Sequence, residues 1–324
     1  MTVKRDIKRA NRISEAVEFP AVILIDNCNA CNLQCSMCDH KNMRRYRKVQ
    51  LMDTELHKRL IDEIAVEKPE ARVWEIFFGE PFMCWDMAKR VRYAKDRGLK
   101  DVVLNSNGVM MSKKRALAVI EARLDGMYVG IDASTENTYN KIRIGGNFSK
   151  AVKNVLQYRD LLHKFGSSEQ KLFVQFVVSD INEHEVEDFQ EFWEDKGVNV
   201  KIRPKVSWAG LVDATNLQKD EKVHRKPCYW LMRTINICAD GLVALCSVDV
   251  HCRVQCGDAT TQTIKQIWQG KLKEYRRMHK EARFCELPEM CRRCLDWQSA
   301  YADFVIANYV GEKVENETAQ VKGK

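Results

Sequence analysis

Short apolar, β-branched segments alternate along the first two thirds of the chain with longer segments whose apolar residues recur every three to four positions. The first pattern predicts buried strands and the second predicts amphipathic helices. Strands are expected at 21–26, 72–78, 101–105, 126–132, 171–178 and 198–203, with helices at 53–66, 85–97, 112–122, 148–165 and 183–196. Six strands alternating with helices indicate an α/β fold with a parallel sheet and right-handed crossovers. The pattern does not distinguish an open sheet from a curved partial barrel.

The pattern changes after about residue 205. Apolar segments at 234–237 and 243–245, separated by a short polar turn, predict a β-hairpin, and a helix is expected near 262–281. A cysteine-rich segment follows. We therefore expect four parts: a basic extension (1–20), a first domain (21–205), a second domain (206–300) and a polar tail (301–324).

Composition excludes several classes of protein. The 324 residues contain no run of about 18 apolar positions, so a membrane span is not expected. The first twenty residues are basic and lack the apolar core of a secretory signal. Thirteen cysteines without such a signal argue against a disulfide scaffold, and they favour metal or redox chemistry in the reducing cytoplasm.

The net charge of +8 comes partly from two basic stretches, at 41–48 and 271–283. Solvated helix and loop faces are the ordinary explanation for such stretches. An anionic substrate, such as a phosphate, a nucleotide-linked sugar or an acidic peptide, is the alternative. Nucleic acid is not favoured, because no RNA-binding module and no pattern of aromatic and basic residues is visible.

Three cysteines directly after the first expected strand carry the most informative chemistry. Cys31, Cys35 and Cys38 form a C-x3-C-x2-C motif. Three thiolates can hold three irons of a [4Fe-4S] cluster and leave the fourth iron open, whereas an electron-transfer cluster normally takes four cysteines. A zinc loop is the alternative, although zinc sites usually close with a second, nearby pair. The spacing resembles the radical S-adenosylmethionine (SAM) family, whose open iron binds the amino and carboxylate groups of SAM.

The resemblance continues at the ends of the next two strands. The segment Phe78–Pro81 is similar to the family's Gly-Gly-Glu-Pro motif, with Phe78 in place of the first glycine. The segment Asn105–Gly108 is similar to the family's Thr-Asn-Gly turn near the SAM ribose. The resemblance implies contacts with SAM from Gly79, Glu80, Asn105 and Asn107.

Two further motifs follow the fourth strand. The segment Gly130–Ser134 resembles Ser-Ile-Asp-Gly, with Gly130 in place of the serine, and Tyr139–Gly146 resembles Tyr-x-x-x-Arg-Gly-Gly. Each motif alone is also typical of an ordinary turn, but their order along the strands makes them jointly informative. Met37, next to the third cysteine, is expected near adenine or in the core. The implied contacts with SAM come from Asp132, Ser134, Arg143 and Met37, with Arg143 at the carboxylate.

A second cysteine set lies in the last third of the chain. Cys228 and Cys246 flank the expected hairpin, and a C-x2-C pair follows at Cys291 and Cys294. Four such thiolates can form a closed tetrahedral site, for which structural zinc is the alternative. The arrangement resembles the SPASM/twitch extension of the radical SAM family, which holds an auxiliary [4Fe-4S] cluster. Four protein ligands imply a cluster that transfers electrons and does not bind substrate.

The remaining cysteines are expected to be small buried hydrophobes. Cys252, Cys256 and Cys285 raise the count toward the two-cluster form of the extension, but no cysteine lies five residues beyond Cys294, so a second auxiliary cluster is not favoured. Cys84, four residues after Glu80, is a candidate hydrogen-atom donor of the kind that an epimerase requires.

The resemblance implies a partial (β/α)6 barrel with the site at the C-terminal ends of its strands, followed by a small α+β SPASM/twitch domain. A low-potential reductant such as flavodoxin or ferredoxin would supply one electron. SAM would then yield a 5′-deoxyadenosyl radical, which removes a hydrogen atom from the substrate. The substrate radical would pass an electron to the auxiliary cluster.

The substrate expected from the resemblance is a small polyol or sugar, either neutral or anionic, oxidised at a carbinol carbon. Arg203, Lys205 and Trp208 lie where the last strand meets the second domain, and they could contact it. Only about thirty residues precede Cys31, which is short for a domain that binds a leader peptide. A peptide or protein maturase, an epimerase, and a non-catalytic zinc or iron–sulfur module remain alternatives. The sequence does not predict the oligomeric state.

Overall fold

The computed structural model describes residues 18–215, 217, 225–299 and 305–307. The predicted basic extension and the predicted tail therefore lie almost entirely outside the described residues. No helix in the described ranges is both long enough and apolar enough to cross a membrane.

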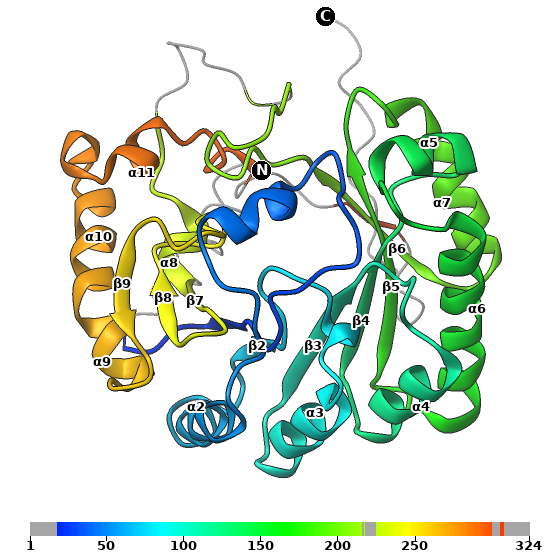
Figure 1. Cartoon of the computed structure of the whole chain (residues 1–324), viewed down its shortest axis with the longest axis horizontal. Helices are drawn as coiled ribbons and strands as arrows, with labels where there is room; N and C mark the ends of the chain where they lie inside the picture. Colours follow the sequence, from blue (N-terminus) through cyan, green and yellow to red (C-terminus); the bar gives the residue numbers. More distant parts are fainter. Residues whose placement is uncertain (1–17, 216, 218–224, 300–304, 308–324) are drawn as a thin grey trace, which may run out of the picture.

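Six parallel strands form the centre of the molecule (Figure 1), as the sequence predicts. Strands that are consecutive in the chain are neighbours in the sheet, and each pair is parallel. This arrangement confirms the partial-barrel fold class. The strands are β1 (Val22–Ile25), β2 (Arg72–Trp74), β3 (Asp101–Ser106), β4 (Gly126–Gly130), β5 (Lys171–Val178) and β6 (Asn199–Pro204).

The helices between these strands begin at polar capping residues and pack on the sheet through apolar faces. Asp53, for example, accepts hydrogen bonds from the backbone N–H groups of Glu55 and Leu56, which satisfies two free donors of the first turn. The structure adds one helix, α5, that the sequence pattern missed. The helices are α2 (Thr54–Glu67), α3 (Met87–Asp96), α4 (Lys113–Glu121), α5 (Glu136–Ile142), α6 (Phe148–Phe165) and α7 (Val186–Asp195), with short 3-10 helices η1 (Asp39–Arg45), η2 (Pro81–Met83) and η3 (Glu183–Glu185).

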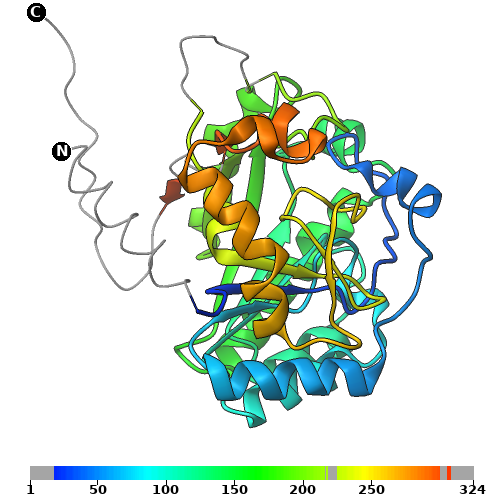
Figure 2. The ribbon, with the colours of Figure 1, turned by 90° about the vertical axis from the view of Figure 1, so that its left-hand side faces the viewer.

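The last third of the chain extends the same sheet. β7 pairs in parallel with β1, and β8 and β9 continue antiparallel from it. The predicted helix at 262–281 is two helices that meet at Gly270, and they lie along the side that Figure 2 turns toward the viewer. The elements are α8 (Tyr229–Arg233), β7 (Thr234–Ile237), β8 (Leu242–Ala244), β9 (Gln255–Asp258), α9 (Ile264–Gln269), α10 (Lys271–Lys280), η4 (Phe284–Glu286), α11 (Glu289–Arg293) and β10 (Val305–Ala307).

A small apolar cluster joins the loop after β1 to the last third of the chain. Phe78 packs with Met43 of η1 and with Val250, and all three side chains are buried. The Phe78 ring also meets the edges of the Trp208 and His251 rings, at centroid distances of 5.5 and 5.8 Å. Phe78, which stands where the family has glycine, therefore fills the contact between the loops of the first domain and the last third of the chain. We call this contact the joint.

Replacing Phe78 with alanine should therefore loosen this joint. We expect Phe78→Ala to lower the free energy of unfolding by about 3–5 kcal/mol, because it removes a large buried ring and leaves a cavity. Urea denaturation followed by circular dichroism would measure the change.

Phe165 provides the matched control, because 51% of its surface is exposed whereas Phe78 is 4% exposed. Phe165→Ala should change the free energy of unfolding by less than about 0.5 kcal/mol. Equal effects of the two substitutions would contradict the packing argument.

Candidate functional site

A cavity of about 150 Å³ opens where strands β2 to β6 end, beside the loop that follows β1. The three thiols of the C-x3-C-x2-C motif line it, and we call these residues (Cys31, Cys35 and Cys38) the three-thiol site. Burial raises the pKa of Cys31 to about 11 and the pKa of Cys38 further still. Other predicted residues that line the cavity are Met37, Gly79, Glu80, Asn105, Asn107, Asp132, Arg143, Arg203 and Lys205.

The loop after β2 packs closely against the loop that carries the three cysteines. A Cβ atom on Gly79 would overlap the carbonyl oxygen of Cys28 and would lie 2.8 Å from the carbonyl oxygen of Ala30. The backbone N–H of Glu80 donates to the same Ala30 carbonyl at 2.8 Å. Glycine at position 79 is therefore needed for this close approach.

Glu80 is a buried carboxylate that organises the loop after β3. It accepts hydrogen bonds at 2.8 Å from the Ser106 hydroxyl and from the backbone N–H of Asn107. Burial raises its pKa, although these donors act in the opposite direction. The amide of Asn107 in turn donates to Asn32 in the cysteine loop at 2.9 Å. Glu80 and Asn107 thus belong to one network that joins the loops after β1, β2 and β3, whereas Asn105 accepts a hydrogen bond from Gln175.

Arg143 and Asp132 form a buried ion pair beside the three-thiol site. Asp132 has a positive φ of 60° and also accepts from the backbone N–H of Val177 at 2.7 Å. The Nη1 atom of Arg143 lies 3.7 Å from the Cys35 sulfur. Burial opposes the Arg143 charge, but Asp132 and Cys35 outweigh this effect and raise its pKa. A Cβ atom on Gly130 would overlap the Arg143 guanidinium, which explains why glycine replaces the family's serine.

One wall of the cavity is basic and aromatic. The Nε atom of Arg203 is buried and has no hydrogen-bond partner among the described residues. Burial lowers the pKa of Arg203, and Arg143 lowers it further. Trp208 lines the same wall, and its indole N–H donates to the Met37 carbonyl at 2.8 Å. Arg203 reaches the cavity from the end of β6, and Lys205 and Trp208 reach it from the segment that follows this strand.

A second, enclosed cavity brings together the four cysteines of the last third. We call Cys228, Cys246, Cys291 and Cys294 the four-thiol site. Its other walls are mainly apolar, formed by side chains such as Leu231, Leu245 and Trp297. Burial raises the pKa of each thiol, and the other three thiols raise that of Cys246 further. A bound cation would stabilise the thiolates that burial disfavours.

Three polar residues that the sequence analysis missed surround this site. His279 lies 3.4 Å from the Cys291 sulfur, and the Nη2 atom of Arg225 lies 3.5 Å from it. Asp296 is fully buried near Cys294, and it accepts from the backbone N–H groups of Ser207 and Ala209. Only proximity in the sequence to Cys294 could have indicated Asp296, and no sequence signal connects His279 to Cys291.

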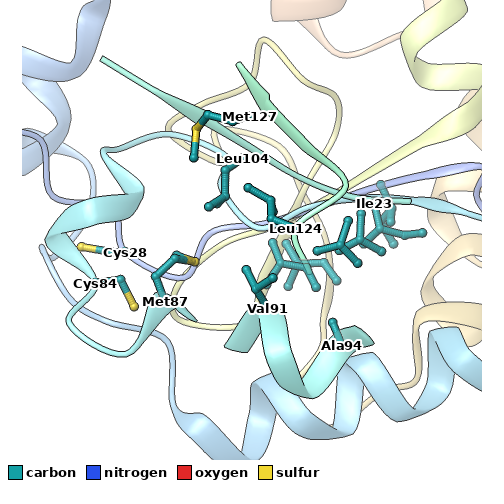
Figure 3. Close-up of a cluster of buried hydrophobic side chains, with 14 of the residues drawn as sticks. Ile23, Cys28, Cys84, Met87, Val91, Ala94, Leu104, Leu124 and Met127 are labelled. Carbon is teal, nitrogen blue, oxygen red and sulfur yellow. The ribbon is translucent and has the colours of Figure 1, made fainter. Parts of the chain in front are cut away.

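The structure places two predicted site residues outside the lining of the first cavity. Ser134 does not line the first cavity, because its N–H and hydroxyl groups donate to Glu185. Cys84 lies in the hydrophobic core beside Cys28 and Met87 (Figure 3), and its thiol contacts Asp86 at 3.0 Å. Neither residue is placed to contact a molecule in the cavity.

The remaining cysteines give no support to a second auxiliary cluster. Cys285 is exposed, Cys256 is buried on β9, and the Cys252 thiol is next to that of Cys238. No interaction among the described residues joins Cys285 to Cys252 or Cys256. Within the same residues, no three His, Cys, Asp or Glu side chains are close enough to hold a single metal ion. A four-iron cube spaces its thiolates more widely than one ion does.

Family models match both halves of the chain. The model of the radical SAM superfamily matches residues 28–192, which is half of the chain. The chain belongs to the radical SAM superfamily. A second model, of the SPASM iron–sulfur cluster-binding domain, matches residues 228–295. The two domains imply [4Fe-4S] clusters, and the matched ranges contain the three-thiol and four-thiol sites, respectively.

Curated relatives match only part of the chain. A probable GTP 3′,8-cyclase from Methanococcus maripaludis is 30% identical over 128 residues, which cover 39% of this chain and 41% of that protein. A 7,8-dihydro-6-hydroxymethylpterin dimethyltransferase from Methanocaldococcus jannaschii is 27% identical over 199 residues, or 60% of this chain and 38% of the relative. The chain thus spans about two fifths of the length of these relatives.

Solved structures share the fold over most of the chain at low sequence identity. BtrN in complex with AdoMet and 2-DOIA has a TM-score of 0.57 and 17% identity, covering 85% of this chain and 93% of BtrN. Streptococcus suis SuiB bound to the precursor peptide SuiA has a TM-score of 0.64 and 10% identity, covering 82% and 69%. The anSMEcpe structure with bound AdoMet has a TM-score of 0.58 and 15% identity, covering 86% and 84%.

The residues present fit the cofactors that the family implies. The three-thiol site borders an open cavity, so a fourth iron there could take a small ligand such as SAM. The four-thiol site is enclosed and offers one thiolate for each iron of a cube. Neither set contains a disulfide, and all seven thiols are free.

The fit of Arg143 against Gly130 yields a prediction about SAM binding. Gly130→Ser places a Cβ atom where the guanidinium lies, so it should separate Arg143 from Asp132. Because Arg143 is predicted to pair with the SAM carboxylate, we expect the affinity for SAM to fall at least about 10-fold, equivalent to ~1.4 kcal/mol. Equilibrium binding of SAM to the anaerobically reconstituted protein would measure it.

Ser134→Ala is the control, because Ser134 belongs to the same sequence motif but lies outside the cavity. Its affinity for SAM should match that of the unchanged protein. Unchanged SAM affinity in Gly130→Ser would contradict the proposed position of Arg143.

Proposed function

We propose that this radical SAM enzyme oxidises a small polyol or sugar-type substrate by removing a hydrogen atom and then an electron. The observation that supports the proposal is that two different thiol sites lie beside the same sheet. The three-thiol site borders an open cavity, whereas the four-thiol site is enclosed. An open site suits binding of SAM, and an enclosed, fully ligated cluster suits electron transfer.

The residues around the first cavity have separate roles in this proposal. A reduced [4Fe-4S] cluster with bound SAM supplies the hydrogen-atom abstraction. The thiols of Cys31, Cys35 and Cys38 would hold that cluster, and Arg143 would meet the negative charge of the SAM carboxylate. Glu80 holds the Asn107 loop in place through a 2.8 Å hydrogen bond. Trp208 and Phe78 would limit access of water to the reacting atoms.

The basic wall supports an anionic group on the substrate. Arg203 brings a buried guanidinium with an unpartnered Nε atom to this wall, and Lys205 lies beside it. A phosphate or carboxylate on the substrate would satisfy the Nε atom of Arg203 and would hold the reacting carbon in a fixed orientation. The fold neighbour BtrN, which this chain matches over 93% of that protein, was solved with AdoMet and 2-DOIA.

Modification of a peptide is the second candidate. It is supported by two fold neighbours, SuiB bound to its precursor peptide and anSMEcpe bound to a Kp18Cys peptide. An epimerase with a cysteine donor is less well supported. Among the described residues that line the first cavity, the cysteines are those of the three-thiol site itself.

Formation of 5′-deoxyadenosine tests the proposed chemistry. The anaerobically reconstituted protein, given SAM and dithionite, should form this product, and Cys35→Ala should abolish it because one iron loses its ligand. Mass spectrometry would measure 5′-deoxyadenosine with phosphorylated and neutral polyols and with peptides. Phosphorylated polyols should increase the yield of 5′-deoxyadenosine the most.

Cys285→Ala is the matched control, because Cys285 is exposed and lies outside both cavities. Its product yield should equal that of the unchanged protein. Stimulation by peptides but not by polyols would favour the second candidate, and an active Cys35→Ala protein would overturn the site assignment.

The surface beside the three-thiol site supports an acidic protein as the electron donor. Lys41, Arg44, Arg45 and Lys48 follow Cys38 directly and are exposed. No described residue forms an ion pair with any of the four. η1 is held by the buried Met43 and by a 2.7 Å contact between Asp39 and His251. A flavodoxin or ferredoxin with an acidic face would be attracted to this basic surface.

Charge reversal at this surface should slow reduction by a protein but not by a small chemical. With flavodoxin as donor at low salt, Arg44→Glu combined with Arg45→Glu should reduce the rate of 5′-deoxyadenosine formation about 10-fold or more. With dithionite the rate should stay within about twofold, since dithionite needs no docking surface. The flavodoxin effect should shrink as salt is added.

Lys273→Glu combined with Lys280→Glu is the matched control. These two exposed cations lie on α10, and their reversal changes the net charge by the same amount. Equal losses in the two double variants would show a general charge effect and no docking at η1.

A further inference from the structure

Cys291 differs from the other cysteines of the four-thiol site in the groups that face its sulfur. His279 Nε2 lies 3.4 Å from this sulfur and Arg225 Nη2 lies 3.5 Å from it. The Cys228 sulfur instead faces backbone N–H groups of α8. Among the described residues, no side-chain donor reaches the sulfur of Cys228, Cys246 or Cys294.

The protonation of His279 follows from its other contact. The backbone N–H of Cys228 lies 3.2 Å from His279 Nδ1, and a backbone N–H can only donate. Nδ1 is therefore the unprotonated nitrogen, and the ring proton is on Nε2. That N–H faces Cys291, so it donates a hydrogen bond to the sulfur. One imidazole thus links two of the four cysteines.

The histidine is held rigidly in this orientation. It is fully buried at the end of α10, and its ring meets the Phe284 ring edge-on at 5.6 Å. Phe284 also lies under the Arg225 guanidinium, at 4.9 Å. Arg225 is fixed further by hydrogen bonds to the carbonyl oxygens of Cys291 (2.7 Å) and Arg292 (2.9 Å).

Charged groups of both signs lie near the site, and the neutral donor acts in addition to them. Arg225 adds a positive charge beside Cys291, while the buried Asp296 carboxylate lies 3.9 Å from the Cys294 sulfur. These charges act in opposite directions on a cluster held between the two sulfurs. The His279 hydrogen bond has no such counterpart.

We propose that His279 raises the reduction potential of the auxiliary cluster by donating a hydrogen bond to the Cys291 thiolate. This inference rests on the proposed assignment of that cluster to the four-thiol site. A hydrogen bond to a ligand sulfur withdraws electron density and stabilises the reduced cluster, which carries one more negative charge. His279 is thus a positioning residue that makes the cluster a better acceptor for the substrate electron.

A redox titration of the auxiliary cluster alone tests the proposal. Combining Cys31→Ala, Cys35→Ala and Cys38→Ala in the full chain removes the first cluster. In this background, His279→Phe removes the donor while keeping a ring, and the midpoint potential measured by electron paramagnetic resonance should shift to a lower value. His279→Gln should restore most of it, because the Gln amide can accept from Cys228 and donate to Cys291.

Lys280→Gln is the control, since it removes an exposed charge from the next residue without reaching Cys291. It should leave the midpoint potential unchanged. An unchanged potential in His279→Phe with full iron and sulfide would overturn the proposal. Absence of iron in the triple-cysteine background itself would instead contradict the cluster assignment on which the proposal rests.

A spectroscopic measurement covers the case in which His279→Phe does not fold. With ¹⁵N-labelled histidine, the reduced auxiliary cluster should show hyperfine coupling to a histidine nitrogen, and His279→Gln should remove it. A fully loaded cluster without such coupling would also overturn the proposal.

Discussion

The parallel pairing of β1 with β7 is the interaction on which both candidate metal sites depend. β1 leads into the loop of the three-thiol site, and β7 leads through the hairpin to Cys246. Val22 pairs with Thr234 and Ile25 with Ile237, so the two strands leave the sheet in register. A linker between separate domains would allow the two sites to move relative to each other. A shared sheet fixes their separation, so a substrate held at the first site would stay at a constant distance from the second.

Polar contacts at the same joint specify its geometry more than they stabilise it. Arg47 is buried between Asp26, at 3.7 Å, and Asp240, at 3.6 Å, and its remaining donors are incompletely satisfied. Burial outweighs Arg47 and raises the pKa of Asp26 to about 7, so the ionised carboxylate is costly there. The apolar contacts of Phe78 stabilise this contact region, and the ion pairs of Arg47 link the segment after η1 to Asp26 and to Asp240 of the hairpin turn.

Local patterns explain which features could be predicted from the sequence. The bounds of β5, α6 and β7 match the predicted segments because apolar periodicity and turn residues determine them. Partner choice is not local, so nothing in residues 234–237 indicated that this strand joins β1. Contacts of side chains with distant residues are also not encoded locally. Ser134 fits a family motif, but its hydrogen bonds are accepted by Glu185, fifty-one residues later. His279 was missed for the same reason.

The two thiol sites differ in how the groups around them would compensate the charge of a bound cluster. At the first site the cation that faces Cys35 is already paired with Asp132, so it lends the cysteines little net positive charge. That site also borders an open cavity and the exposed basic surface of η1. At the second site the thiols are enclosed, and a neutral N–H donor faces Cys291. The pairing of Arg143 with Asp132 leaves a cluster at the first site with less compensation of its negative charge, whereas a hydrogen bond to a thiolate raises the reduction potential of a cluster at the second. A substrate on the basic wall would therefore meet a donor of radical chemistry first and an acceptor afterwards.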